Sequence, residues 1–108
     1  MALGLRLASV YELQLEDADK AIEALRGVTS IVPDHGEALG SLARLFERRG
    51  EYRDYVDVVR TMASYADGAE RVSLVHRVGE VLERKLDDVD EAIATYEEAL
   101  GLDPAHAP

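Results

Sequence analysis

The chain lacks cysteine, asparagine and tryptophan, and it contains only three prolines. Without cysteine it can form no disulfide, no thiolate metal site and no cysteine nucleophile. No apolar run approaches the roughly 20 residues that a membrane-spanning helix needs. The apolar segment 1–10 has its one charge, Arg6, inside the run, and no small-residue cleavage site follows it. We therefore interpret this segment as a helix rather than a signal peptide, and we expect a cytoplasmic location.

Basic residues are scarce relative to acidic ones: 12 Lys and Arg stand against 22 Asp and Glu, a formal net charge of −10. Nucleic acids and anionic membrane surfaces are polyanions, so we expect neither as a partner. The imbalance is local, because residues 72–108 carry 3 basic and 9 acidic side chains whereas residues 36–71 carry 6 and 7. The net charge therefore does not predict the sign of every local surface.

Apolar residues make up 47% of the chain and charged residues 31%, which is typical of a folded globular protein. A length of 108 residues is sufficient for one domain with its own core, and we expect a single domain over residues 1–108.

The sequence repeats itself internally. When it is shifted by 71 residues and compared with itself, many positions are identical without a gap. The identities pair Glu12 with Glu83, Leu15 with Leu86, Asp17 with Asp88, Asp19 with Asp90, Ala21 with Ala92, Ile22 with Ile93, Pro33 with Pro104 and His35 with His106. A third copy lies between them, offset by 35 residues from the first, and it includes Leu39, Leu42, Ala43 and Phe46. The chain therefore contains three repeats, at about 1–35, 36–70 and 71–108.

Each repeat contains two segments with apolar residues at helical spacing, for example Leu3, Leu7 and Val10 in the first segment. This periodicity predicts six antiparallel helices, at 2–14, 18–32, 36–49, 53–66, 70–85 and 89–101. No room is left for strands, so the predicted class is all-α.

The predicted breaks have local causes. Asp17 and Asp88 stand where helix N-caps belong, and their charge suits the helix dipole. Gly50 can adopt the left-handed conformation that ends a helix. The second helix of each repeat is expected to stop at Pro33, at Asp67 and Gly68, and at Pro104.

This pattern resembles the tetratricopeptide repeat, a helix pair of about 34 residues with small and aromatic residues at fixed positions. The third repeat carries the resemblance with Val75, Val78, Gly79, Leu82, Ala92, Tyr96, Ala99 and Pro104. The first carries it with Gly4, Leu7, Ala8, Tyr11, Ala21, Leu25, Val28 and Pro33. The resemblance implies a short right-handed α-solenoid in which the small residues Ala8, Ala43 and Gly79 let paired helices approach closely.

Two departures from the family pattern predict irregularity. The outer repeats each have one extra residue before the turn, at Leu15 and Leu86, which lengthens the first helix or loosens its end. The middle repeat has Tyr55 where the family has a small residue, so we expect that helix pair to splay or shift.

Few residues have the arrangement that chemistry needs. The acidic run at 87–91 lacks the glycine and the glutamate spacing of a calcium loop, and a capped helix start explains it. His35 and His106 occupy the same linker position in separate repeats, and His76 lies within a helix, so the histidines form no metal set. No nucleotide-binding or hydrolase motif is present. We therefore expect a non-catalytic protein with no metal and no cofactor.

The resemblance places ligand contacts on the first helix of each repeat, which lines a concave groove. The corresponding positions hold Arg6, Ser9, Ser41, Arg44, Arg48, His76, Arg77, Glu80 and Arg84. The family's carboxylate clamp needs asparagines, which this chain lacks, but five arginines suit an acidic protein or peptide segment. The alternative is a solvated surface on which the arginines pair with Glu47, Glu80 and Glu83. The expected function is a protein–protein interaction scaffold.

The ends of the stack suggest a second function. The last helix carries Ile93, Tyr96, Ala99 and Leu100, some of which are expected to face a next repeat, and Leu3, Leu5 and Leu7 present apolar surface on more than one side of the first helix. Two explanations stay open. The chain is either a fragment of a longer array or a module that self-associates, most simply as an isologous homodimer through one end.

Overall fold

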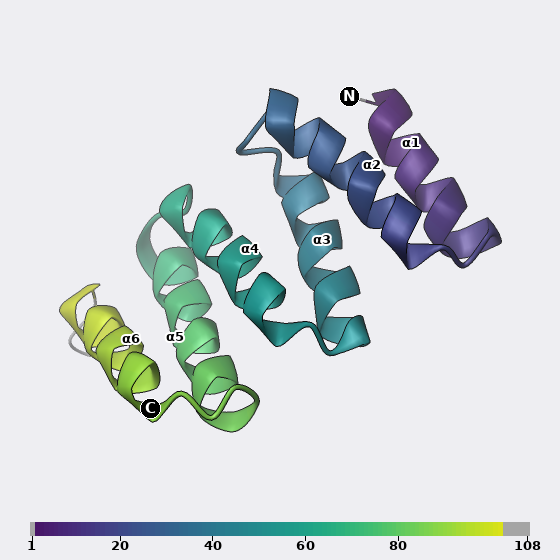
Figure 1. The fold of residues 1–108 in the computed structure, drawn as a ribbon. Coiled ribbons are helices and arrows are strands. Elements are labelled where there is room, and N and C mark those ends of the chain that lie inside the picture. Colours follow the sequence, from purple (N-terminus) through teal and green to yellow (C-terminus); the bar gives the residue numbers. More distant parts are fainter. Residues whose placement is uncertain (1, 103–108) are drawn as a thin grey trace. The chain divides into compact units, whose positions relative to one another are not determined.

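The computed structural model describes residues 2–102, and every regular element among them is helical (Figure 1). In chain order the elements are α1 (Ala2–Ser9), the π-helix η1 (Val10–Gln14), α2 (Ala18–Ile31), α3 (Gly36–Arg49), α4 (Tyr52–Ser64), α5 (Gly68–Arg84) and α6 (Val89–Leu102). The predicted all-α class is confirmed, and each predicted helix boundary lies within two residues of the observed one when α1 and η1 are taken together as the first helix. No helix within this part of the chain is long and apolar enough to cross a membrane. The predictions for Pro104 and His106 lie outside the described residues.

The helices form two compact units, Met1–Gly50 and Glu51–Pro108. In the N-terminal unit α1 and η1 pack on α2, and α2 packs on α3. In the C-terminal unit α4 packs on α5, and α5 packs on α6. The division falls between α3 and α4, inside the predicted middle repeat. The single domain, the right-handed path and the splaying of the middle pair at Tyr55 therefore stay predictions.

The paired helices of both units approach through small buried residues, as the sequence predicts. Ala8 on α1 and Ala21 on α2 are buried in the N-terminal unit. In the C-terminal unit Gly79 on α5 lies against the Tyr96 ring on α6, where an added Cβ would come within 2.7 Å of the ring. Ala92 is buried in the same helix pair. Such close approach allows the larger neighbouring side chains to exclude water from the helix interface.

Side-chain caps begin the helices where the sequence predicts them. The Lys20 N–H donates to Asp17 Oδ1 at 3.1 Å, and the Glu91 N–H donates to Asp88 Oδ1 at 3.2 Å. His35 is also a cap rather than only a linker residue, since its Nδ1 accepts the Ala38 N–H at 3.3 Å. Gly50 ends α3 in the left-handed conformation, with φ 74°. These contacts satisfy backbone groups that a helix end otherwise leaves to water.

The prediction that Asp67 and Gly68 end the second helix of the middle repeat was wrong. Helix α4 already ends at Ser64, and Tyr65 follows as its C-cap. Asp67 instead immediately precedes α5, and Gly68 is the first residue of that helix, with φ 57°. Aspartate and glycine both suit a helix start as well as a turn, so composition alone could not separate the two roles.

The extra residue in each outer repeat widens the end of the first helix. In the N-terminal unit the Leu15 N–H donates to the Val10 carbonyl, and the Asp17 N–H donates to the Tyr11 carbonyl. The C-terminal unit repeats this pattern at the equivalent positions 86 and 88. Glu16 and Asp87, which are equivalent residues, have positive φ angles of 51° and 52°. Each turn therefore accommodates the inserted residue in two ways. Its backbone hydrogen bonds join residues farther apart than the four of an α-helix, and one residue adopts the left-handed conformation.

Candidate protein-binding groove

A hollow of about 400 Å³ in the N-terminal unit is lined by α1, η1, α2 and α3. Leu25 and the buried Ala8 provide apolar surface inside it, and Leu5 and Leu13 add apolar side chains from α1 and η1. Its polar lining consists of Ser9, Glu12, Glu37, Ser41, Arg44 and Arg48. The hollow therefore combines an apolar surface with polar and charged groups, as protein interfaces do.

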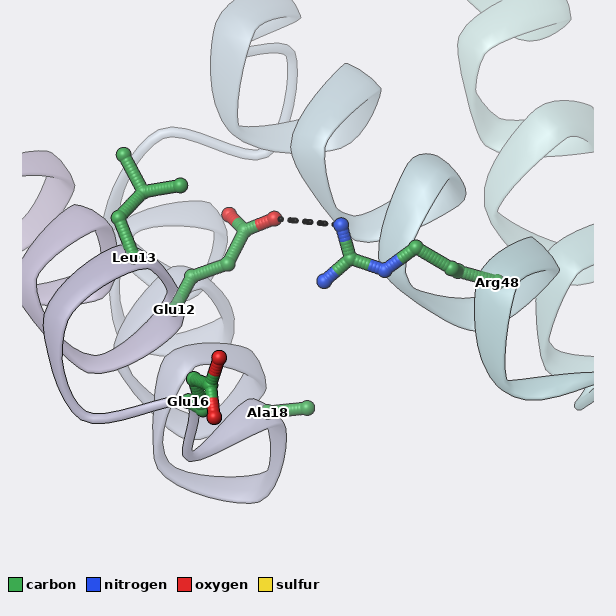
Figure 2. Close-up of a pocket in the computed structure, with 5 residues that line it drawn as sticks. All are labelled: Glu12, Leu13, Glu16, Ala18 and Arg48. Carbon is green, nitrogen blue, oxygen red and sulfur yellow. Dashed lines mark ion pairs between the residues drawn. The ribbon is translucent and has the colours of Figure 1, made fainter.

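Glu12 organises the charged part of this hollow. Its Oε1 lies 2.7 Å from Arg44 Nη2 and its Oε2 lies 3.4 Å from Arg48 Nη1, so one carboxylate bridges two guanidinium groups. The Glu12 side chain is only 8% exposed, whereas both arginine side chains are more than half exposed. Figure 2 shows the Glu12 carboxylate directed at Arg48 in an adjoining hollow of about 420 Å³, which Leu13, Glu16 and Ala18 also line.

Helix spacing explains why the arginines act together. Arg44 and Arg48 are four residues apart on α3, so they project from the same face of that helix, and Ser41 precedes Arg44 by one turn. Their positive charges converge on Glu12 because η1 carries that residue toward α3. Each guanidinium has five N–H donors, and Glu12 contacts one nitrogen of each. The exposed remainder of each group can receive a second carboxylate.

The equivalent glutamate in the C-terminal unit has another partner. Glu83 lies 71 residues after Glu12, and its Oε1 accepts the Tyr96 hydroxyl at 2.9 Å. Leu25 occupies the Tyr96 position in the N-terminal unit and has no hydroxyl to donate. The Glu12 carboxylate is instead held by arginines of α3.

The Tyr96 phenol is held in its neutral form. Burial, the hydrogen bond to Glu83 and the negative charges of Glu83 and Glu80 raise the pKa of Tyr96 from 10.0 to about 12. Each of these causes penalises a phenolate or stabilises the protonated hydroxyl. Tyr96 is therefore a structural donor between α5 and α6.

The remaining candidate residues lie on α5. Glu80 contacts His76 Nδ1 at 3.7 Å and Arg84 Nη1 at 3.9 Å, which are its neighbours one turn away on either side. The His76 ring lies 5.5 Å from the Tyr96 ring, and the Arg77 guanidinium lies 5.7 Å from the centre of the Tyr55 ring. These residues form a mixed-charge surface, and the expected pairing of an arginine with Glu80 is present.

Four residues of the predicted groove, Ser9, Ser41, Arg44 and Arg48, line a single hollow. Arg6 is exposed on α1, outside the described lining of that hollow. His76, Arg77, Glu80 and Arg84 lie on α5 in the C-terminal unit. The continuous arginine row across the three repeats stays a prediction.

Sequence reasoning missed Glu12 and the apolar residues Leu13 and Leu25 as parts of the site. The internal repeat did match Glu12 with Glu83, which indicated a shared structural position. The pairing of Glu12 with α3 joins residues 32 and 36 positions apart, so helix periodicity contains no signal for it. Among residues 2–102, no cluster of three or more His, Asp or Glu side chains could hold a metal ion.

Comparison with known proteins gives two matches, both to repeats of one kind. Residues 2–35 match one tetratricopeptide repeat family model, and residues 73–106 match another. The two matched segments together cover more than half of the chain, and their first residues are offset by the same 71 residues as the internal repeat. No curated protein matches the sequence.

Proposed function

Because the chain belongs to the tetratricopeptide repeat family, we propose that it is a non-catalytic interaction scaffold whose N-terminal unit binds an acidic peptide or protein segment. Repeats of this family generally mediate protein–protein interaction and are typically non-catalytic. The proposed site is the hollow lined by α1, η1, α2 and α3, with Ser9, Ser41, Arg44 and Arg48 as its polar contacts.

The observation that carries this proposal is the arginine pair held by Glu12. Both guanidinium groups are oriented by one carboxylate while most of each side chain stays exposed. Arginine binds carboxylates through two parallel hydrogen bonds. Two arginines held in a fixed orientation therefore suit a ligand segment whose acidic side chains recur at helical or extended spacing. Leu5 and Leu13 beside the arginines supply apolar contacts for the same ligand. An acidic segment with interspersed apolar residues therefore fits both the charge and the surface of the hollow.

The test uses a charge reversal in the groove and a matched reversal elsewhere. Arg48→Glu removes one arginine of the pair, whereas Arg71→Glu makes the same change on the exposed surface of α5. Binding of a short peptide of leucine and glutamate is measured by calorimetry, with its leucine–glutamine version as a second control. We expect Arg48→Glu to weaken binding by about tenfold or more and Arg71→Glu to have little effect. Equal affinity of all three proteins for the acidic peptide would rule out this site.

Glu12→Gln should change the affinity for the acidic peptide in the opposite direction. Glutamine keeps the size of the side chain but removes the negative charge that competes with a ligand carboxylate. We expect tighter binding of the acidic peptide, accompanied by a small loss of stability of about 0.5–1 kcal/mol from the lost ion pairs. Weaker binding in this variant would show that Glu12 is needed to orient the arginines and does not compete with the ligand.

A second candidate function is self-association. It is favoured by exposed apolar side chains on the first and last described helices, including Leu3 and Leu7 on α1 and Ile93 and Leu100 on α6. Light scattering over a concentration series tests it, since a mass that stays at that of one chain at high concentration would exclude it. Peptide binding in the groove and self-association use different surfaces, so the two functions can be measured independently.

A further inference from the structure

The apolar residues exposed on α1 occupy positions that are buried elsewhere in the same unit. Leu3 is 85% exposed, yet its equivalent 35 residues later, Ala38 on α3, is 0% exposed. Leu7 is half-exposed, and its equivalent Leu42 is buried. Helix α3 packs on α2, and Phe46, one turn after Leu42 on the same face of α3, lies beside Arg26 of α2. The exposed face of α1 is therefore the face that a first helix presents to the second helix of a preceding repeat.

Helix α6 shows the complementary situation. Ile93 is 50% exposed, whereas its equivalent 71 residues earlier, Ile22 on α2, is 9% exposed. The equivalent of the exposed Leu100 is Thr29, which is half-buried. The pair α1–α2 corresponds to the pair α5–α6, but α2 has α3 packed on it in addition. Among the described residues no helix follows α6, so its outer face resembles α2 with α3 removed.

These two observations fit each other. We infer that α6 of one copy packs against α1 of a second copy, and that this contact reproduces the α2–α3 packing seen within the N-terminal unit. The inference rests on self-association, the second candidate function, and does not involve the groove. The interface joins two different surfaces, so it is heterologous and leaves one free end on each copy for further addition.

Charge also favours this pairing. Helix α6 contains four acidic residues and no basic one, and the only charged residue of α1 is Arg6. An isologous contact between two α6 helices would bring the Asp90 and Glu97 carboxylates of both copies together and is disfavoured by like-charge repulsion, whereas Glu91 and Glu98 pair with Arg53 and Arg60 of α4. A contact between α6 and α1 has no such repulsion.

The polar pairs at the edge of the α2–α3 contact have compatible replacements in the proposed interface. Arg49 pairs with Asp19 at 2.6 Å across α2 and α3, and the equivalent residues are Gln14 and Asp90, an amide donor and a carboxylate. Arg26 lies 5.5 Å from the centre of the Phe46 ring. The equivalent residues there are Glu97 and Tyr11, a carboxylate and a hydroxyl donor. In both replacements a donor faces a carboxylate and can form a hydrogen bond with it. The polar groups at the edge of the proposed interface therefore have partners, as those at the edge of the α2–α3 contact do.

The experiment uses two charged variants of the full chain at exposed positions. Leu3→Glu blocks the α1 face and Ile93→Glu blocks the α6 face, while Ile31→Glu places the same charge on an exposed apolar residue of α2. Sedimentation velocity measures the mass of each protein over a concentration series, and circular dichroism verifies that each is folded. We expect the unmodified chain and Ile31→Glu to associate, and each blocked variant alone to associate about tenfold or more weakly.

Mixing the two blocked variants is the decisive measurement. Leu3→Glu retains a usable α6 and Ile93→Glu retains a usable α1, so the mixture is expected to form a 1:1 dimer that cannot grow. If Leu3→Glu alone still forms dimers and mixing adds nothing, self-association is isologous and the head-to-tail interface is wrong. If the unmodified chain has the mass of a single copy at every concentration, self-association itself is wrong, and these faces bind something other than a second copy.

Discussion

At the residue scale, single side chains decide how closely two helices of a pair approach. The N-terminal unit combines Ala8 with Leu25, and the equivalent positions in the C-terminal unit combine Gly79 with Tyr96. The larger ring on α6 is thus accompanied by the smaller residue on α5. In each unit the side-chain volume on one helix is matched by the space left on the other, as close packing of the interface requires.

Gly79→Ala is expected to destabilise the protein by about 1–2 kcal/mol, because the added Cβ would overlap the Tyr96 ring. This cost opposes the roughly 1 kcal/mol by which alanine favours a helix over glycine. Urea unfolding measures the difference.

Gly27→Ala is the control, since a Cβ at this exposed position of α2 meets no atom within 4 Å and should stabilise the helix by about 0.5–1 kcal/mol. The double change Gly79→Ala with Tyr96→Leu copies the N-terminal pair and should recover part of the loss. If it recovers none, the clash with the ring is not the cause.

Tyr96 predicts a pH dependence at alkaline pH. Below pH 10 the phenol is protonated in both the folded and the unfolded chain, so it contributes no change in stability. Between pH 10 and about 12 the unfolded chain loses the proton that the folded chain keeps, and the stability falls as the pH rises. The ultraviolet titration of tyrosinate in the unmodified chain, minus that of Tyr96→Phe, should have its midpoint near 12. A midpoint near 10, with the helix signal intact, would contradict the assigned hydrogen bond and burial.

At the scale of elements, the turns after the first helices of the outer repeats show how an insertion is accommodated. Helix propensity and periodicity place these helix ends to within two residues. The wider hydrogen-bonded rings and the left-handed residues that follow depend on the chain reaching Asp17 and Asp88, where the next helices are capped. The extra residue of each outer repeat could be predicted from the internal alignment, and the way the turn absorbs it could not.

Glu16→Gly is expected to stabilise the protein by about 1 kcal/mol, because glycine adopts the left-handed conformation without the Cβ penalty. Asp87→Gly should give a smaller gain, since aspartate tolerates this conformation better than glutamate does. Thermal unfolding monitored by circular dichroism measures both changes. Glu16→Ala removes the carboxylate but keeps the Cβ, so a gain as large as that of glycine would point to the charge of Glu16 as the cause.

At the scale of the whole molecule, the chain is two compact units, and each has its own buried residues. In repeat proteins each element contacts mainly its neighbours, so a local loss of packing remains largely local. Leu25→Ala in the N-terminal unit and Leu82→Ala in the C-terminal unit each remove a fully buried side chain and should cost about 2–5 kcal/mol. Hydrogen exchange should increase mainly in the unit that carries the change. A uniform increase over both units would show that they unfold as a single cooperative body.

The sequence by itself determined the class, the number of helices and their limits, because these depend on short-range spacing, caps and an internal repeat of 71 residues. Four residues of the predicted groove, Ser9, Ser41, Arg44 and Arg48, line one hollow, and their role in binding stays a prediction. The tertiary structure decided which contacts those residues make. It joined Glu12 to Arg44 and Arg48 and left apolar residues of α1 and α6 exposed. Such contacts depend on which helices pack together. The periodicity of one helix shows which of its faces is buried, and it does not show which helix covers that face.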